Sequence, residues 1–189
     1  MPTFNTYKEH IAAAQSAWAK VVKSQDIVID ATCGNGHDTL FLTSLNPHLV
    51  YALDIQKEAI TATSLLTAAY KEKIKFIQSC HSLFPEEIQP STVKLIIYNL
   101  GYLPGGNKSI TTQTETTLAS LKLAENYLVE GGMISVMCYP GHSEGKKEEN
   151  ALLAWAENLT TSLWKVCHYR WLNRPNHPSL LLVSKTIKF

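Results

Sequence analysis

The sequence predicts an α/β protein with a doubly wound, mostly parallel seven-stranded sheet and an antiparallel hairpin at its C-terminal end. Three observations predict this fold class. Short β-branched runs alternate with longer helical patterns, as in parallel sheets whose crossovers are helices. A glycine-bearing turn joins the first predicted strand to a helix. The last two runs are separated by a loop too short for a helical crossover, so they are expected to pair antiparallel.

Seven short runs predict the strands. They are rich in apolar and β-branched residues and are bounded by turn residues, which is typical of buried strands. The loop between the last two runs contains Pro175 and Pro178. In chain order the predicted strands cover residues 27–30, 50–54, 74–77, 93–98, 133–138, 164–169 and 180–184.

Helical patterns fill the segments between these runs. Capping boxes at residues 6–9 and 112–115 open two of the helices. Another helix begins near Asp38, one covers residues 57–70, and the pair Gly131-Gly132 is predicted to end the helix before the fifth strand. The apolar stripes expected to face the sheet are Ile11, Ala14, Trp18 and Val21, then Leu118, Leu121, Ala124 and Leu128, and finally Ala151, Leu152, Trp155 and Leu159.

Composition indicates one globular domain spanning residues 1–189 and excludes several other classes of protein. The chain is 45% hydrophobic and 17% charged, with a formal net charge of +1, so it has neither a disordered composition nor a strongly basic arm. We expect no signal peptide and no membrane span. The four cysteines contain no Cys-x-x-Cys pair, which argues against a zinc site and a disulfide framework and favours the reducing cytoplasm.

The turn after the first strand is predicted to bind a cofactor. In sheets of this kind, ligands bind beyond the carboxyl ends of the strands, where the strand order reverses. Gly34 and Gly36 would let a ligand approach the backbone, and Asp54, at the end of the second strand, can accept the hydroxyl groups of a ribose. The turn reads Asp30-Ala31-Thr32-Cys33-Gly34-Asn35-Gly36-His37-Asp38-Thr39.

The charge of this turn favours S-adenosylmethionine over NAD. A dinucleotide-binding turn needs a third glycine, where this chain has Thr39, and it places a pyrophosphate on the helix N-terminus. Asp30 would repel that pyrophosphate but would tolerate a cationic sulfonium ligand. The alternative is that Asp30 only orders the turn by accepting backbone N–H groups.

Further cofactor contacts are predicted around the next two strands. Cys80 and His81 follow the third strand, where the adenine end of such a ligand is expected, although a solvent-facing loop histidine is the alternative. Gln56 could cover the base edge or simply start the next helix.

The segment Asn99-Leu100-Gly101-Tyr102-Leu103-Pro104 follows the fourth strand and is the candidate catalytic motif. The Asn99 side-chain oxygen can accept from an amine N–H and align its lone pair with a methyl carbon, while Tyr102 can stack on a base. Catalysis would then be by positioning, and we expect no metal ion. The alternative is a turn that uses Asn and Gly for their backbone freedom.

Two later loops lie on the same predicted edge. In Tyr139-Pro140-Gly141-His142, Tyr139 could stack on a base and His142 could act as proton acceptor or phosphate contact, although each taken singly also fits a plain turn. The loop of residues 171–178, with Arg174 and neighbouring polar residues, could bind RNA or a partner subunit, or could be solvated surface.

The chain resembles a family of small class I methyltransferases first described as rRNA methylases, which have a Rossmann-like fold. Two segments carry the specific part of the resemblance, residues 98–106 and 137–142, and the glycine turn of residues 30–39 is typical of the wider superfamily. The similarity runs from about residue 18 to residue 185. Leu100 and Gly101 stand where many N-methyltransferases have prolines.

The resemblance implies a bacterial tRNA methyltransferase that acts on 5-aminomethyl-2-thiouridine at the wobble position of the anticodon stem-loop. It implies S-adenosylmethionine as donor, with Asn99, Tyr102, Tyr139 and His142 facing the nucleotide. The residues it places around the cofactor are Asn35, Gly36, His37, Asp38, Asp54, Gln56, Cys80 and His81.

Three other functions stay open from the residues alone. The enzyme could instead methylate rRNA or a small amine, the chain could be a non-catalytic cofactor-binding adaptor for RNA or protein, or, least favoured, it could be a nicotinamide oxidoreductase. The apolar N-terminal helix and the C-terminal hairpin could support a homodimer or complete the core of a monomer.

Overall fold

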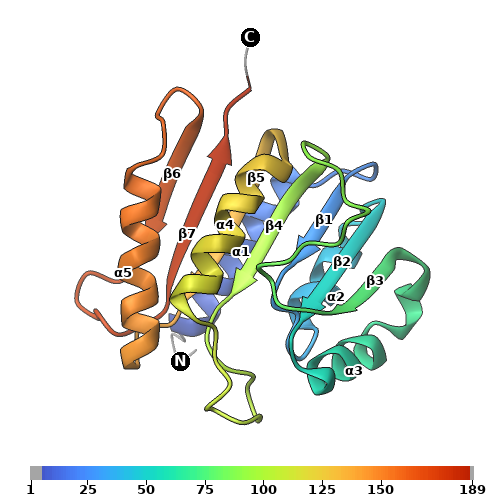
Figure 1. Ribbon diagram of the computed structural model, residues 1–189, viewed down its shortest axis with the longest axis horizontal. Coiled ribbons are helices and arrows are strands. Elements are labelled where there is room, and N and C mark those ends of the chain that lie inside the picture. Colours follow the sequence, from blue (N-terminus) through green and yellow to red (C-terminus); the bar gives the residue numbers. More distant parts are fainter. Residues whose placement is uncertain (1–5, 188–189) are drawn as a thin grey trace, which may run out of the picture.

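The computed structural model describes residues 6–187, and the side chains from residue 9. It contains the seven predicted strands and the helices between them (Figure 1). The helices are α1 (Thr6–Val21), α2 (His37–Ser44), α3 (Lys57–Leu66), the 3₁₀ helix η1 (Ala68–Lys73), α4 (Thr114–Tyr127) and α5 (Ser143–Glu157). The strands are β1 (Ile27–Asp30), β2 (Leu49–Asp54), β3 (Ile74–Gln78), β4 (Val93–Asn99), β5 (Leu128–Cys138), β6 (Trp164–Tyr169) and β7 (Ser179–Lys185).

The strands form one sheet in the order β3-β2-β1-β4-β5-β7-β6. β1 to β5 pair in parallel, whereas β7 runs antiparallel to both β5 and β6. The predicted fold class and the C-terminal antiparallel hairpin are therefore confirmed. The strand order reverses between β1 and β4, so this point on the carboxyl edge is where a ligand is expected.

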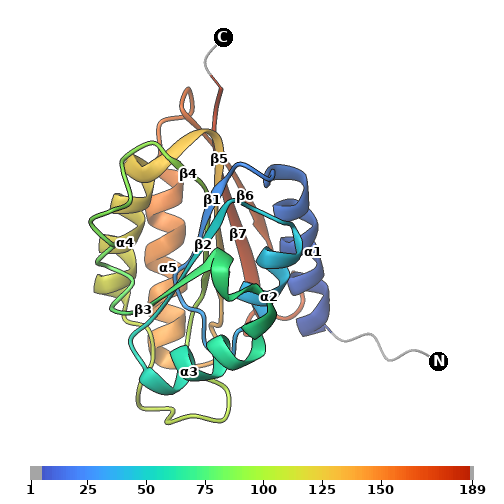
Figure 2. The ribbon, with the colours of Figure 1, turned by 90° about the vertical axis from the view of Figure 1, so that its right-hand side faces the viewer.

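Helices cover both faces of the sheet (Figure 2). α1, α2 and α3 pack on one face, where Trp18, Leu42 and Val50 belong to one hydrophobic cluster. α4 and α5 pack on the other face, in a cluster that includes Leu121 and Leu152. The apolar stripe of α1 thus completes the core of this chain. This is one of the two roles predicted for that helix, the other being a dimer interface. The capping side chain expected at Thr6 lies outside the described side chains.

The predicted end of one helix and the predicted start of another are wrong. The helix predicted for residues 57–70 ends at Leu66, and the following residues form the 3₁₀ helix. α4 begins at Thr114 with Gln113 as N-cap, not at a box opened by Thr112. The Glu144 carboxylate of α5 accepts the Thr114 backbone N–H at 3.0 Å, so a distant side chain caps α4 and the local box is not used.

The fifth strand begins five residues earlier than predicted, at Leu128, and Gly131-Gly132 lie inside it. Leu128 pairs with Val93, but the next pair along β4 is Leu95 with Met133. The extra residues on β5 form an irregularity of the bulge type, and Gly131 takes a positive φ of 68° there. The glycines therefore serve the bulge, a role that the helix-ending pattern in the sequence concealed.

Gly36 shapes the turn that enters α2. Its φ of 86° lies in the left-handed region, and a Cβ at this position would lie 2.8 Å from the Cα of Thr63. The backbone of the glycine turn is therefore pressed against α3, and Thr63 also donates its hydroxyl to the Gly34 carbonyl at 3.0 Å. In the part of the chain that the structure describes, no helix is long and apolar enough to cross a membrane.

Candidate active site

Three polar residues end three neighbouring strands at the carboxyl edge of the sheet. Asp30 is the last residue of β1, Asp54 of β2 and Asn99 of β4. Because these strands are parallel neighbours, the sheet brings their ends to one edge beside the point of strand reversal. Asp38, in the first turn of α2, also reaches this edge, because its carboxylate contacts Asn99.

Asp30 orders the glycine turn. Its carboxylate is 0% exposed and accepts the Thr39 hydroxyl at 2.6 Å and the Thr32 backbone N–H at 3.3 Å. Burial, together with the neighbouring charges of Asp38 and Asp54, raises the pKa of Asp30 to about 7. These contacts fit the alternative in which Asp30 orders the turn by accepting hydrogen bonds. Asp30 therefore holds in place the turn that a ligand would contact.

Asp54 holds the same turn from the second strand. One of its carboxylate oxygens accepts the Gly34 backbone N–H at 3.0 Å, and the other accepts the Gln56 backbone N–H at 2.9 Å. Its side chain is half-buried, and burial raises its pKa above the ordinary value. The Gln56 N–H thus closes the turn after β2 at the start of α3, which fits the helix-starting alternative for that residue.

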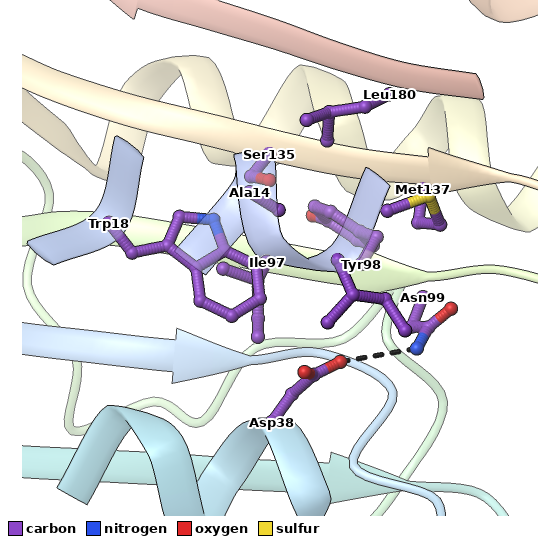
Figure 3. Close-up of a pocket in the computed structure, with 10 residues that line it drawn as sticks. Ala14, Trp18, Asp38, Ile97, Tyr98, Asn99, Ser135, Met137 and Leu180 are labelled. Carbon is purple, nitrogen blue, oxygen red and sulfur yellow. Dashed lines mark hydrogen bonds between the residues drawn. The ribbon is translucent and has the colours of Figure 1, made fainter. Parts of the chain in front are cut away.

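Asn99 is fixed at both its backbone and its side chain, and Figure 3 shows the side-chain bond to Asp38. Its side-chain NH₂ donates to the Asp38 carboxylate at 3.1 Å, and its backbone N–H donates to the Thr32 hydroxyl at 2.7 Å. The Gln15 side chain of α1 also hydrogen-bonds Asp38. Burial raises the pKa of the Asp38 carboxyl above its ordinary value. Since a carboxylate can only accept, this bond orients the Asn99 amide with its NH₂ toward Asp38 and leaves the carbonyl oxygen for another donor.

A small cavity lies beneath α1 behind these two residues (Figure 3). Trp18, Ser135 and Met137 line it together with Asp38 and Asn99, and its volume is about 10 Å³. Sites for organic ligands usually measure about 300–1,000 Å³. This cavity is therefore a packing gap with room for about one water molecule. It is not a cofactor site.

The loop after β4 meets both the glycine turn and the loop after β5. The Asn35 side-chain NH₂ donates to the Pro104 carbonyl at 3.2 Å. Tyr102 is 41% exposed, its ring centroid lies 6.3 Å from that of His142, and the Lys108 ammonium lies 5.5 Å from the Tyr102 ring centre. The structure thus brings together the two motifs predicted to face a nucleotide.

His142 caps α5 and holds one tautomer. Its Nδ1 accepts the Gly145 backbone N–H at 3.1 Å, so the neutral ring carries its proton on Nε2. Within residues 9–187, that buried Nε2 has no hydrogen-bond partner. Because the lone pair of Nδ1 is occupied, the prediction of His142 as proton acceptor is not supported by these contacts. The ring is instead a hydrogen-bond donor, which fits the other predicted role, an anion contact.

His81 is buried under α4, so the alternative of a solvent-facing loop histidine is wrong. The residue is 8% exposed, and burial lowers its pKa to about 4. Its Nε2 lies 3.4 Å from the Thr117 hydroxyl, its ring makes an edge contact with Tyr98, and its carbonyl accepts from Ser120. The described contacts of His81 are with β4 and α4, whereas Cys80 is half-buried and accepts the Ser82 hydroxyl at 3.1 Å.

A buried glutamate network that the sequence reasoning missed supports the motif loop. Glu148 of α5 is 3% exposed and accepts the hydroxyls of Thr112 at 2.9 Å and Thr117 at 2.6 Å. Thr112 in turn accepts the Gly101 backbone N–H at 2.8 Å. The available sequence signal was spacing: Glu148 lies four residues before Leu152, which places it on the apolar face of the predicted helix.

The remaining predicted residues lie at the rim. His37 is exposed at the start of α2, and Tyr139 packs at the edge of the α1-side cluster. Arg174 is exposed and lines a separate hollow beside α5. Among residues 9–187, no group of three or more His, Cys, Asp or Glu side chains is placed to hold a metal ion.

The acidic side chains at this edge suit a positively charged ligand. Three carboxylates lie at this edge, Asp30 and Asp54 at strand ends and Asp38 in the first turn of α2, and the pKa of each is raised, first by burial. Loss of a proton by any of them adds negative charge in a poorly solvated place. A nearby cation would stabilise that charge, whereas a diphosphate would be repelled.

Comparison with known proteins places the chain in a family. The model of the family described as "Putative rRNA methylase" matches residues 50–185. The chain is also 42% identical to the tRNA (mnm(5)s(2)U34)-methyltransferase, chloroplastic, of Arabidopsis thaliana. The match covers 94% of this chain and 70% of that relative. The chain belongs to this family. The resemblance predicted from its motifs is therefore confirmed.

Solved structures agree with this assignment. The crystal structure of a putative rRNA-methylase from Clostridium thermocellum is 34% identical, with a TM-score of 0.87, and the match covers 93% of this chain and 97% of that one. The structure of a protein described as a putative methyltransferase from Streptococcus mutans, in complex with SAH, is 31% identical with a TM-score of 0.84 and the same coverage. These two structures show the class I methyltransferase fold, and their sequence identities of 34% and 31% also support membership of the family.

The buried Asp30 predicts a specific dependence of stability on pH. The pKa of about 7 in the folded chain lies above the ordinary value of 3.8, so the folded state binds the proton more tightly than the unfolded state. Proton binding by Asp30 therefore adds to the free energy of unfolding. This addition is complete below about pH 4, falls between about pH 4 and 7, and is lost as pH rises through 7. We expect this loss to approach about 1.4 kcal/mol per pH unit.

The control is Asp30→Asn, which is neutral throughout and keeps an oxygen for the Thr32 N–H. Urea unfolding of both proteins between pH 4.5 and 8 should show the stability difference, wild type minus variant, falling with pH and levelling above 7. A difference that is constant or rises with pH would contradict a carboxyl group held protonated by burial.

Proposed function

We propose that this chain is a single-domain S-adenosylmethionine-dependent tRNA methyltransferase. It transfers a methyl group to the amine of 5-aminomethyl-2-thiouridine at the wobble position, and 5-methylaminomethyl-2-thiouridine is the product. The substrate assignment draws on the 42% identity with the plant enzyme, whose name states that it acts on U34 of tRNA. The cofactor draws on the SAH-bound relative.

The observation that carries the proposal is the fixed amide of Asn99. Asp38 holds its NH₂ at 3.1 Å, and the carbonyl oxygen is left as an acceptor at the edge where Asp54 and the glycine turn meet. An acceptor held in this orientation can take an N–H of a neutral amine and aim the nitrogen lone pair. Positioning of this kind supplies most of the rate when the donor already carries a good leaving group.

The residues proposed to hold the donor lie on the glycine turn and the ends of β2 and β3. When bound, S-adenosylmethionine supplies the methyl group from its sulfonium centre. Asp54 offers carboxylate oxygens suited to ribose hydroxyls, and the carboxylates of Asp30 and Asp38 provide the negative charge that suits a cation. The other proposed cofactor contacts are Gly34, Asn35, Gly36, His37, Gln56, Cys80 and His81.

The nucleotide is proposed to lie against the loops after β4 and β5. Tyr102 and Tyr139 offer rings for stacking on a base. His142 has Nδ1 occupied by the Gly145 N–H, and its Nε2, which is buried without a partner among the residues that the structure describes, is the proposed donor to an acceptor of the substrate. The amine must be neutral before it can attack, and exclusion of water by the two loops favours its neutral form.

Replacing Asn99 and its partner separates orientation from binding. Asn99→Ala should lower kcat by about 10²-fold, the usual cost of losing one positioned polar group. Asp38→Ala should lower kcat less, because the amide persists but can rotate. Asp38→Asn should recover part of that loss, since its carbonyl oxygen can accept the same NH₂.

Because Asp38 is also a proposed cofactor contact, the Kd for the donor is measured beside kcat in each variant. Equal kcat values for wild type and Asn99→Ala at saturating substrates would exclude Asn99 from the chemistry. Equal kcat values for Asp38→Ala and Asp38→Asn would exclude the orienting bond.

The nature of the RNA substrate is tested in cells. The family description names rRNA, so rRNA is the competing substrate. We expect nucleoside digests of tRNA from cells lacking this protein to lose 5-methylaminomethyl-2-thiouridine and to gain its unmethylated precursor. Complementation with Asp54→Ala should fail to restore the methylated nucleoside. Loss of a different nucleoside, from rRNA, with tRNA unchanged would overturn the tRNA assignment.

The anticodon stem-loop is proposed as the part of tRNA that is bound, and a cytoplasmic location and a homodimer remain proposals from the sequence. The plant relative is named as chloroplastic. The exposed side chains of Val166 and Tyr169 on the edge strand β6 are the apolar surface that a dimer would use.

A further inference from the structure

A basic hollow lies beside the proposed nucleotide site, on the C-terminal side of the sheet. It has a volume of about 70 Å³, and its cationic lining residues are Lys146, Arg170 and Arg174. Sites for organic ligands are usually several times larger, at about 300–1,000 Å³. The hollow therefore suits a single anionic group such as a phosphate better than a base or a nucleoside.

The hollow has surplus positive charge. Its carboxylate, Glu149, is 5% exposed and is already engaged by the Lys146 ammonium at 2.9 Å and by the Ser179 hydroxyl at 2.6 Å. Within residues 9–187, neither Arg170 nor Arg174 forms an ion pair. Two guanidinium groups thus remain to meet an incoming anion, and guanidinium matches phosphate oxygens in a bidentate manner.

The wider charge distribution has the same sign. From residue 158 to the C-terminus the sequence contains five basic residues and no acidic residue, although the whole chain has a net charge of only +1. The rest of the chain is therefore net acidic. Of these basic residues, Arg170 and Arg174 line the hollow, whereas Lys165 and Lys185 lie at the other end of the β6–β7 pair.

The hollow is held next to the loop that carries His142. Lys146 lies in the first turn of α5, and its backbone N–H donates to the His142 carbonyl at 2.9 Å, so the two residues are about one helical turn, or about 5.4 Å, apart. Trp171 donates its indole N–H to Nδ1 of His10 at 3.2 Å, which attaches the lining loop to α1. The hollow thus has a defined position relative to the proposed site.

We propose that this hollow binds a backbone phosphate of the RNA substrate, close in sequence to the nucleotide that is modified. The inference rests on the proposed function for the identity of the polymer. A target nucleotide that enters the Tyr102 and His142 site remains joined to its neighbours, so a phosphate must lie within a nucleotide or two of that site. Arg170 and Arg174 bind this phosphate, and Lys146 adds long-range attraction.

The test measures RNA binding directly and does not require methylation. A fluorescently labelled anticodon stem-loop with an unmodified uridine at the wobble position is titrated at several salt concentrations. For Arg170→Ala/Arg174→Ala we expect a Kd raised about tenfold or more. The slope of log K against log[salt] should become shallower by about 0.7 for each phosphate contact that is lost on single-stranded RNA.

Two further variants serve as controls. Lys165→Ala removes an exposed cation from the same C-terminal segment, on β6 and outside the hollow, and should leave Kd and the slope close to those of the wild type. Arg170→Lys/Arg174→Lys keeps the charge without the guanidinium geometry and should be intermediate. All substituted side chains are exposed, so thermal melting should be unchanged, and the Kd for S-adenosylmethionine should not move.

The outcomes separate this inference from the proposed function. If the double alanine variant binds RNA like Lys165→Ala, the phosphate site is overturned, whether or not the wild type methylates tRNA. If the wild type binds RNA but methylates no tRNA, and the double alanine variant no longer binds RNA, the proposed function fails and the phosphate site stands. If the double variant loses only binding of a poly-glutamate peptide, the hollow serves an acidic protein and the inference is overturned.

Discussion

The arrangement of this molecule depends on negative charge that is kept away from water at the ends of parallel strands. Asp30 is fully buried at the end of β1, and Asp38 and Asp54 lie near it on the next helix and strand. Each carboxylate accepts from a neighbouring donor: Asp30 from the Thr39 hydroxyl of α2, Asp38 from the Asn99 amide of β4, and Asp54 from the Gly34 backbone N–H of the turn. The same charges that shape the turn therefore set which ligand it can accept.

This constraint connects the cofactor side to the catalytic side of the edge. Asp38 belongs to the helix that follows the glycine turn, yet its carboxylate orients the amide of Asn99 on β4. Thr32 within the turn accepts the Asn99 backbone N–H. Two hydrogen bonds thus join the candidate catalytic group to the glycine turn and to the helix that follows it. On the opposite side, the buried Glu148 fixes the loop that carries Tyr102 through Thr112 and Gly101.

The sequence was sufficient to predict the fold and the meeting of Asp30, Asp54 and Asn99 at one edge of the sheet, because both follow from local patterns. Alternating strands and helices with one short final loop imply the sheet and its hairpin, and polar residues at strand ends must meet at one edge. Contacts between distant segments could not be read in this way. The capping of α4 by Glu144, the burial of His81 under α4 and the bulge around Gly131 each depend on a partner far away in sequence.

The role of His142 shows the same limit at the level of chemistry. Its place after β5 predicted a polar residue at the site, but whether it accepts or donates a proton depends on which ring nitrogen the Gly145 N–H occupies. The turn-ordering role of Asp30 likewise became visible only from its two donors and its complete burial.

The most direct test of the account compares the affinities of S-adenosylmethionine and S-adenosylhomocysteine by calorimetry at pH 6 and pH 8. A cation beside Asp30 should lower the pKa of about 7, so the donor should release a proton on binding and bind up to about tenfold more tightly at pH 8. The product lacks the sulfonium charge and should show a much smaller change. The same pH dependence for both compounds, or tighter binding of NADH than of either, would contradict the central role of the buried carboxylates.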